Sequence, residues 1–594
     1  MKKHYGIKLA SLTLILSLSV SLAACGNNNS GSNGNTGSTN GGSSDNGNGT
    51  TDVSKLLDPN AEPAKDPFGK FSPAIEVTTV HTDNGVAKNA PDKSTIEKNI
   101  YTQTWEDKLG IKLKYNWSAP NTQAEEKMNL MIASGDLPDF FYVSPSQFEK
   151  LVSTGQLEDM TEEVQDYATK YMKKYLTGDY QGLLESVTRN GKIYGIPNGM
   201  TYHDQGNMLW IREDDLQKAG LSAPKSVADL DKILETFKKN DYDKSGKALY
   251  PIPLADANLN STNWGIGAAF FNMFHSYPDI WIKNSKGELE NGMFGEESRE
   301  NTRKALLKLQ EYYKKGYIHP DFATLDDTKY NEQVVNGQST VVFGGMWDSW
   351  WPLNQILDQK PDAKWAPVAI PSADDQPGKS SVTATMLLGV NVAKKGVKNP
   401  EALVKMENLF HDLNNNPETM QFGKYNTDPK TGFGWFQLYP MHVYNPSFNY
   451  EGFQQVQQAL TDGQGDKLPE AYKTFYDQAK AYQDKNDKNG FPPYLTYTSK
   501  GSEGVVDQYI KEKRFEMNEY TDMPTQNMLD NAPIIKKAWD VMFLNVVKGG
   551  DISQYDDFLA QYDSLYGAVV NPEVNDWFKA KNSESVQTWF DEKK

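Results

Sequence analysis

The chain of 594 residues contains a single cysteine, Cys25. No intramolecular disulfide can form and no cysteine-based zinc site can be built, so neither kind of cross-link holds the fold together. Hydrophobic residues make up 38% of the chain and aromatic residues 12%, which is enough for a large core. We therefore expect a globular protein with more than one domain-sized core.

Acidic residues outnumber basic ones by 78 to 61, which gives a formal net charge of −17 at pH 7. Only five of the basic residues are arginines. Nucleic-acid recognition depends on clustered lysine and arginine side chains that neutralise phosphates and read base edges. The composition therefore excludes nucleic acid as a partner.

The first 24 residues have the layout of a secretory signal peptide. Three lysines precede an apolar run over residues 9–22, which is too short to span a bilayer comfortably. The Leu-Ala-Ala-Cys that ends at Cys25 resembles the lipobox of bacterial lipoproteins, whose cysteine carries a diacylglycerol. This resemblance implies a lipid anchor at Cys25 and a position on the extracytoplasmic face of the cell membrane.

Residues 26–51 are almost wholly Gly, Asn, Ser and Thr. Such a segment buries too little apolar area to offset the entropy of ordering, so we expect a flexible tether with a reach of about 25–30 Å. The next residues are rich in proline and charge. We assign residues 1–24 to the signal, 25–70 to the anchor and linker, and expect the folded body to begin near residue 71.

The start of the body alternates between strand and helix patterns. Residues 75–80 favour a strand, and apolar and polar residues alternate strictly over 111–117, the pattern of a strand with one wet face. Between them, apolar residues recur at helical spacing: Ile96, Ile100, Trp105 and Leu109. This strand–helix–strand unit predicts two parallel strands.

The same alternation continues downstream. Buried-type strands are expected at residues 139–143, 339–343 and 386–392, and capping boxes predict helix starts at Ser146 and Ser226. Strands that alternate with helices are typical of an α/β architecture.

No catalytic motif stands out in the chain. The seven histidines form no HExxH or HxH pattern, there is no GxSxG, and two glycine-rich segments lack the glycines that phosphate binding needs. Adjacent carboxylates arise from composition alone. A glycosidase needs two carboxylates about 5–9.5 Å apart across a cleft, and sequence can neither show nor exclude that pair.

One polar loop has part of a calcium-binding pattern. Asp241, Asp243 and Ser245 occupy the first, third and fifth ligand positions, Gly246 is the sixth residue and Lys247 the seventh. The twelfth position falls on Ile252, where a bidentate glutamate is needed. The loop is therefore either a structural calcium site or a polar turn, and the missing carboxylate favours the turn.

An ordered set of motifs resembles the carbohydrate-binding family of extracellular solute-binding proteins of ABC importers, which includes maltose-binding protein. These motifs are MIASGDLPD at 131–139, GQLEDM at 155–160, GKIYGIP at 191–197, LWIR at 209–212, LQKAGL at 216–221 and VFGGMW at 342–347. They are most similar to the Gram-positive lipoprotein branch. Beyond about residue 420 the resemblance fades.

The resemblance implies a two-lobed α/β fold of the type II periplasmic-binding-protein kind. Mixed sheets flanked by helices build each lobe, and the ligand lies in a cleft that closes by hinge motion. Lobe 1 is expected over 71–198 and about 376–420. Lobe 2 is expected over 199–375 and about 421–594, with a helical segment at its end.

Sugars present apolar C–H faces and a rim of hydroxyls, so aromatic rings and polar side chains bind them together. The resemblance therefore implies ligand contacts from several residues of these two kinds. They are Trp347, Trp264, Tyr142, Asp348, His203, Asp204, Trp350 and Trp435.

We therefore predict a monomeric, lipid-anchored receptor that captures an oligosaccharide or sugar derivative. It would deliver this ligand to the transmembrane subunits of an ABC permease, with no enzymatic step and no cofactor besides the calcium ion considered above. Two alternatives stay open: a surface lipoprotein that cleaves glycans with a carboxylate pair, and an adhesion module without a transporter.

Overall fold

The computed structural model describes residues 56–581, except 178–182, 243–245, 256–266, 429–430, 432, 442, 444 and 523. The expected signal peptide, Cys25 and most of the linker lie outside these residues. Among the described helices, none combines the length and the apolar character needed to cross a bilayer.

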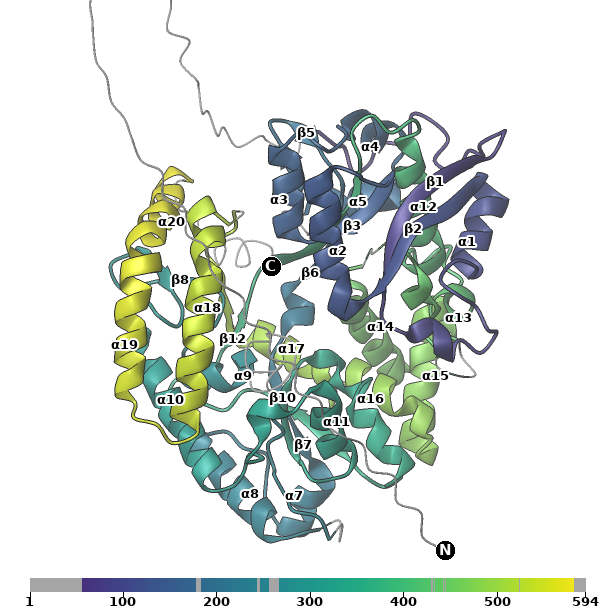
Figure 1. The fold of residues 1–594 in the computed structure, drawn as a ribbon. Helices are drawn as coiled ribbons and strands as arrows, with labels where there is room; N and C mark the ends of the chain where they lie inside the picture. Colours follow the sequence, from purple (N-terminus) through teal and green to yellow (C-terminus); the bar gives the residue numbers. More distant parts are fainter. Residues whose placement is uncertain are drawn as a thin grey trace, which may run out of the picture. The chain divides into compact units, whose positions relative to one another are not determined.

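Strands and helices alternate through the first two thirds of the body, and helices dominate the rest (Figure 1). The strands are β1 (Ile75–Asp83), β2 (Ile111–Pro120), β3 (Phe140–Val143), β4 (Thr188–Arg189), β5 (Lys192–Ile193), β6 (Ile196–Thr201), β7 (Met208–Arg212), β8 (Trp281–Lys283), β9 (Leu289–Asn291), β10 (Val341–Gly344), β11 (Trp365–Val368), β12 (Ser380–Val382), β13 (Thr385–Ala393) and β14 (Phe515–Met517). The α-helices are α1 (Ile100–Thr104), α2 (Asn121–Ser134), α3 (Pro145–Ser153), α4 (Thr161–Tyr167), α5 (Lys170–Thr177), α6 (Leu183–Ser186), α7 (Glu213–Ala219), α8 (Val227–Lys239), α9 (Gly267–Asn272), α10 (Arg299–Lys314), α11 (Asp327–Val335), α12 (Glu401–Asn414), α13 (Phe422–Tyr425), α14 (Phe448–Asp462), α15 (Glu470–Lys485), α16 (Phe491–Tyr497), α17 (Ser502–Lys511), α18 (Gln526–Val547), α19 (Ser553–Tyr562) and α20 (Ala568–Ala580).

The predicted strand–helix–strand unit is confirmed. β1 and β2 pair in parallel, with Ile75 opposite Ile111. The helix between them begins at Ile100, capped by the buried Asn99 side chain, and ends at Gly110, whose φ of 68° is left-handed. Glycine suits this position because other residues pay a steric cost there.

A second sheet of lobe 1 has the order β3–β13–β6, with both pairings antiparallel. The sequence predicted strands at both β3 and β13. Its expected helix start at Ser146 was two residues late, because Ser144 is the N-cap and forms the capping box with Gln147. Pro145 takes the first helical position, where its missing N–H costs nothing.

In lobe 2, β7 lies between β10 and β11 and is antiparallel to both. All five residues of β7 are buried. The predicted capping box at Ser226 is confirmed, since its hydroxyl accepts from the Asp229 backbone N–H at the start of α8. Strand β10 of this sheet ends at Gly344, and Gly345 follows it directly.

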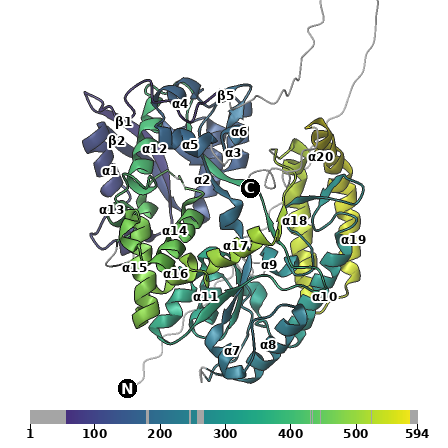
Figure 2. The same cartoon turned by 180° about the vertical axis from the view of Figure 1, so that it is seen from behind.

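Two large hydrophobic cores hold the body together. The first draws on residues 57–196 and 390–443, and the second on 208–382 and 491–562. The chain passes between them after β6, again between β12 and β13, and a third time between residues 443 and 491. Smaller clusters lie around α14–α15 and around α20. The two-lobed α/β fold expected from the sequence is therefore confirmed. In the view of Figure 2, α17 is drawn between α16 and α9, which both belong to the second core.

Candidate functional site

A cavity of about 730 Å³ lies beside α18 and is lined from both lobes. Ser146, at the start of α3, contributes from lobe 1, whereas α9, the 291–294 turn and α18 contribute from lobe 2. Binding pockets for small molecules occupy roughly 300–1,000 Å³. A ligand in this cavity, which we call the α18 cavity, would contact both lobes at once.

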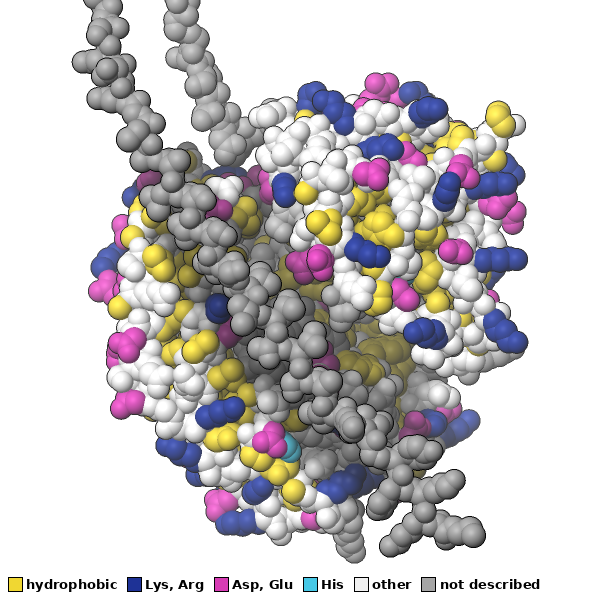
Figure 3. Space-filling view, viewed as in Figure 1, with side chains coloured by type: hydrophobic (Ala, Val, Ile, Leu, Met, Phe, Trp, Pro, Cys, Tyr) yellow, Lys and Arg dark blue, Asp and Glu magenta, His cyan; other side chains and the backbone are white. Residues whose placement is uncertain are grey.

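Aromatic and aliphatic side chains form most of the wall of the α18 cavity. The largest is Trp539 of α18, which is 7% exposed and packs against Phe271 and Phe294 with ring centroids 6.1 and 5.1 Å away. Tyr566 lines the cavity beside them. Figure 3 shows hydrophobic side chains over the body formed by α18–α20. Such rings are suited to stack on the C–H faces of sugars.

One carboxylate, Asp279, stands among these apolar walls. Its side chain is exposed to solvent and lines the cavity, but protein atoms surround it on most sides. The resulting desolvation raises the pKa of Asp279 above its ordinary value, and the nearby positive charge of Lys536 only partly opposes this effect. Asp279 makes no hydrogen bond or ion pair with the other described residues. Its φ of 60° lies in the left-handed region, which aspartate tolerates better than most residues. Its oxygens are therefore available to a ligand.

The second group of candidate residues lies where the chain first crosses between lobes. We call this region the crossing junction: the 3-10 helices η4 (Tyr202–Gln205) and η7 (Met346–Ser349), together with α17. The half-buried His203 ring lies between two tyrosines, 4.0 Å from Tyr202 and stacked at 4.4 Å on Tyr450 of α14. His203 and Asp204 are thus brought to the same region as the Trp347 turn.

Three carboxyl groups are shut inside the crossing junction, those of Asp204, Glu503 and, in the turn after β10, Asp348. Asp204 is 1% exposed and accepts a hydrogen bond from Asn449 Nδ2 at 3.3 Å, and Asn449 in turn accepts from the Tyr497 hydroxyl at 2.8 Å. Glu503, in the first turn of α17, is fully buried, and its carboxylate oxygens have no hydrogen-bond partner among the described residues. Burial, and then the nearby Asp204, raise the pKa of Glu503 well above its ordinary value.

The turn after β10 positions Trp347 and Asp348. A Cβ at Gly345 would lie 2.7 Å from the Trp347 ring, and one at Gly344 would overlap Asp348 Oδ2. Both glycines are therefore required for this close approach. Trp347 is half-buried, whereas Asp348 is 3% exposed and burial raises its pKa well above the ordinary value. A carboxyl group so deeply buried offers its oxygens to the protein interior.

The other expected ligand contacts belong to different elements of the fold. The half-buried Tyr142, at the end of β3, accepts a hydrogen bond from Asn198 Nδ2 at 3.2 Å. Trp350 donates from Nε1 to Thr496 Oγ1 at 2.9 Å. Trp435 is 8% exposed and belongs to the first core. Trp264 lies outside the described residues.

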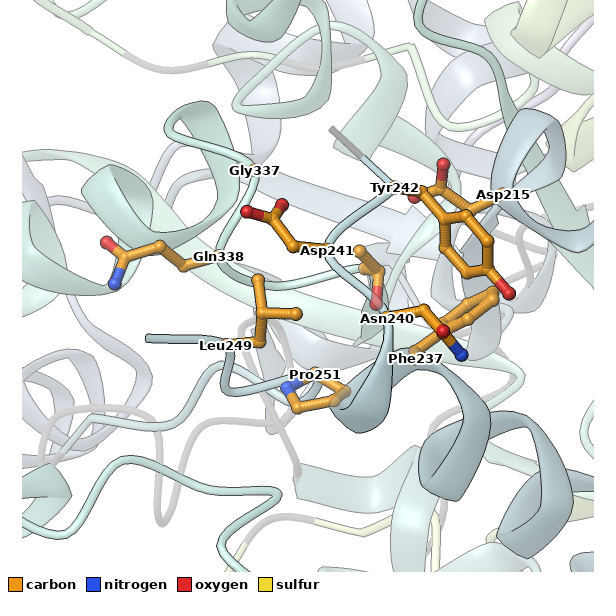
Figure 4. Close-up of a pocket in the computed structure, with 10 residues that line it drawn as sticks. Asp215, Phe237, Asn240, Asp241, Tyr242, Leu249, Pro251, Gly337 and Gln338 are labelled. Carbon is orange, nitrogen blue, oxygen red and sulfur yellow. The ribbon is translucent and has the colours of Figure 1, made fainter. Parts of the chain in front are cut away.

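The polar loop with the partial calcium pattern lines a cavity of only about 10 Å³ (Figure 4), about the space of one water. Asp241 Oδ2 accepts from the Gly246 backbone N–H at 2.8 Å, which is the contact of a polar turn. Asp243 and Ser245 lie outside the described residues, and Ile252 is fully buried and apolar. Of the loop's proposed ligands, Asp241 and Lys247 are described, so the described residues supply one carboxylate for a cation.

Sequence reasoning missed the α18 cavity. Asp279 precedes a strand of three residues and Trp539 lies within a long apolar helix, so neither belongs to a motif. Only folding brings them to Ser146, more than 100 residues earlier in the chain. The left-handed φ of Asp279 is a backbone property that no local pattern announced.

The chain is similar to curated bacterial proteins over part of its length. It is 26% identical to Lipoprotein LipO of Bacillus subtilis over 258 residues, and this stretch covers 42% of this chain and 47% of LipO. It is 31% identical over 186 residues to the fructooligosaccharide ABC transporter substrate-binding protein FusA of Streptococcus pneumoniae, which spans 29% of this chain and 34% of FusA. It is 26% identical over 243 residues to the polygalacturonan/rhamnogalacturonan-binding protein YtcQ of Bacillus subtilis, which spans 40% of this chain and 45% of YtcQ. The matched stretch covers less than half of each of these relatives.

Solved structures share the fold. S. pneumoniae FusA in complex with kestose aligns with a TM-score of 0.59 at 17% identity, over 86% of this chain and 100% of that chain. An HMO-binding, ABC-transporter-associated solute-binding protein from Bifidobacterium longum infantis aligns with a TM-score of 0.58 at 16% identity, over 86% of this chain and 99% of that chain.

The family model described as bacterial extracellular solute-binding protein matches residues 87–405, more than half of the chain. The matched range includes β3, the first two crossings between the lobes and the Gly344–Gly345 turn. Both the sequence motifs and the two-lobed fold agree with this match. The chain therefore belongs to the bacterial extracellular solute-binding protein family.

Proposed function

We propose that this chain is the receptor of an ABC importer that captures an oligosaccharide or sugar derivative between its lobes. The observation that carries the proposal is the α18 cavity, which both lobes line and which combines aromatic rings with one exposed carboxylate. This is the chemistry that a sugar requires, since rings stack on its faces and oxygens accept from its hydroxyls. Two relatives, FusA and YtcQ, bear names of glycan-binding proteins.

The proposal includes a lipid anchor at Cys25, which would hold a monomer on the extracytoplasmic face of the membrane. The Leu-Ala-Ala-Cys pattern supports it, and so does the name of the relative Lipoprotein LipO. Closure of the lobes around the ligand, and release to the permease subunits, would then complete the work. Trp347, Trp264, Tyr142, Trp350 and Trp435 remain proposed ligand contacts, as do Asp348, His203 and Asp204.

The glycan-cleaving alternative is less well supported. It needs two accessible carboxylates on opposite sides of the ligand. Among the described residues that line the α18 cavity, Asp279 is the one carboxylate. The carboxyl groups of the crossing junction, Asp204, Asp348 and Glu503, are all buried, so they cannot reach a glycosidic bond without a rearrangement.

The test is thermal unfolding of residues 51–594, which form one compact unit, in the presence of a broad panel of oligosaccharides. At ~100 times the Kd, binding adds about 2.7 kcal/mol of stability. With an unfolding entropy of ~2.1 cal/mol/K per residue, we expect a rise in Tm of roughly 2–3 °C. The bound glycan should be recovered intact. A shortened glycan would instead support the enzyme, and no shift with any glycan would contradict the receptor.

Trp347→Ala sharpens this test. If Trp347 contacts the ligand, the variant should lose the ligand-induced shift while the Tm of the unliganded protein changes little, because the ring is only half-buried. Trp365→Ala is the matched control, since Trp365 is 2% exposed in the second core. It should lower the unliganded Tm strongly, because truncating a core tryptophan typically lowers the free energy of unfolding by ~3–5 kcal/mol. A similar loss of stability in both variants would make Trp347 a core residue.

A further inference from the structure

The charged groups around the α18 cavity differ from those that bind acidic sugars. Proteins recognise carboxylates and phosphates with arginine forks or with free lysines. The described residues lining this cavity include no arginine, and their charged members are Asp279 and Lys536. The relative strength of the negative charge of Asp279 and the positive charge of Lys536 therefore decides whether the cavity favours neutral or charged ligands.

Lys536 is already engaged. Its Nζ lies 2.8 Å from Asp540 Oδ2, one turn further along α18, and its side chain is 59% exposed. Its charge is therefore shared with a neighbouring carboxylate and screened by solvent. Lys536 offers little attraction to an anionic ligand.

Asp279 is in the opposite situation. Its carboxyl group is open to the cavity, as described above, and has no hydrogen bond or ion pair with the described residues. The surrounding apolar wall (Phe271, Phe294, Trp539 and Tyr566) lowers the local dielectric constant, which strengthens the interaction between Asp279 and any charge on a ligand. A uronate placed here would meet a like charge, whereas a neutral sugar would donate its hydroxyl protons to the Asp279 oxygens.

We propose that Asp279 is a specificity-determining residue that makes the α18 cavity accept uncharged glycans and reject glycans built from uronic acids. This inference rests on the proposed function and adds the charge class of the ligand to it. Asp279 acts as the hydrogen-bond acceptor for hydroxyls of the neutral sugar and as the repelling charge for an acidic one.

The test compares neutral and acidic tetrasaccharides by isothermal titration calorimetry on the full chain. The neutral set contains fructo-, xylo- and cello-tetrasaccharides, and the acidic set contains galacturonate and mannuronate tetramers. We expect at least one neutral member to bind tenfold or more tightly than every acidic one. Because charge repulsion is screened by salt, this ratio should narrow as the ionic strength rises.

Asp279→Asn is the informative variant, because asparagine also tolerates the left-handed backbone and keeps one oxygen acceptor. We expect it to weaken neutral binding about tenfold, to strengthen acidic binding, and to remove the salt dependence of the ratio. Asp557→Asn is the control, since this exposed carboxylate lines a separate groove between α18 and α19. It should change none of these values.

The outcomes separate the two proposals. Acidic tetramers that bind as tightly as the neutral ones would overturn the charge selection, as would a preference that survives in Asp279→Asn, and both would leave the receptor intact. If no glycan of either set or of the broader panel binds, the proposed function itself fails, and the role of Asp279 fails with it.

Discussion

The crossing junction and the α18 cavity both place carboxyl groups among aromatic rings, yet they treat these groups in opposite ways. In the junction, Asp204, Asp348 and Glu503 are at most 3% exposed. In the cavity, Asp279 is exposed to solvent although protein surrounds it. The rings around Asp204 pack on one another, as His203 does on Tyr450, whereas those around Asp279 border open space.

This difference in access to solvent separates carboxyl groups that act on the protein from those that can act on a ligand. A carboxyl group without access to solvent acts on the protein around it for as long as it stays covered, and its burial costs stability unless it is neutral or hydrogen-bonded. One that protein surrounds but does not cover can act on a ligand. The pKa is raised at Glu503 and at Asp279 alike, so the pKa alone would not have told them apart.

The largest effect is expected from Trp539→Ala, which tests whether the wall of the α18 cavity is also core. Trp539 is 7% exposed and contacts Phe271, Phe294 and Phe558. Truncating a buried tryptophan typically costs ~3–5 kcal/mol, and ligand binding should be lost as well. Chemical denaturation measures the first effect and calorimetry the second.

Trp539→Phe keeps a ring in place and should recover most of the stability. If Trp539→Ala unfolded at the same denaturant concentration as the wild type, Trp539 would not belong to the core. The wall of the α18 cavity would then be a mobile flap, and the comparison between this cavity and the tightly packed junction would lose its basis.

A smaller loss is expected from Gly344→Ala, which tests how tightly the junction is packed. The new Cβ would overlap Asp348 Oδ2, so the Asp348 side chain must move within its buried site. Overpacking of this kind typically costs ~1–3 kcal/mol. Differential scanning calorimetry of the unliganded protein measures it.

Gly567→Ala is the matched substitution beside the α18 cavity. A Cβ there would meet only ordinary contacts of 3.5 Å or more, and the residue has a helical backbone with no positive φ. We expect unchanged or slightly higher stability, because alanine restricts the unfolded chain. Equal losses at the two glycines would contradict the difference in packing.

The smallest effect, and one confined to higher pH, is expected from Glu503→Gln. Burial and Asp204 raise the pKa of Glu503 above the ordinary 4.5. The unfolded chain therefore ionises first as the pH rises, and wild-type stability falls from about pH 4.5 upward. Glutamine cannot ionise, so the Tm of the variant should exceed that of the wild type increasingly between pH 5 and pH 8.

Glu512→Gln is the control on the same element, since Glu512 is exposed at the end of α17. It should follow the wild-type dependence of Tm on pH. If Glu503→Gln also followed it, the carboxyl group would be reached by solvent, and the junction would resemble the cavity after all.

Much of the fold was predictable because its signals are local. The alternation over 111–117, the helix stop at Gly110 and the capping box at Ser226 each depend on neighbours in the chain, and each was confirmed. The helix start near Ser146 was misjudged because two capping patterns overlap there and Pro145 favours the earlier one.

The candidate site was predictable only in part. Trp347 was singled out because the stretch 342–347 resembles the family's turn from a strand into the site, and the structure shows that a Cβ at Gly344 or Gly345 would collide with Asp348 or Trp347. The accessibility of a carboxylate carries no such local signal. Asp204, next to a histidine and a tyrosine in the sequence, proved buried, whereas Asp279 proved open.

The sequence by itself determined the order of strands and helices, the alternation that builds an α/β fold, and the membership of a family through motifs that stay contiguous. Periodicity, caps and turns act over a few residues, so they can be read from the chain directly. Only the tertiary structure decided which carboxyl groups are buried and which one faces the α18 cavity. That depends on α3, α9 and α18, elements hundreds of residues apart, because burial is a property of everything packed around a side chain.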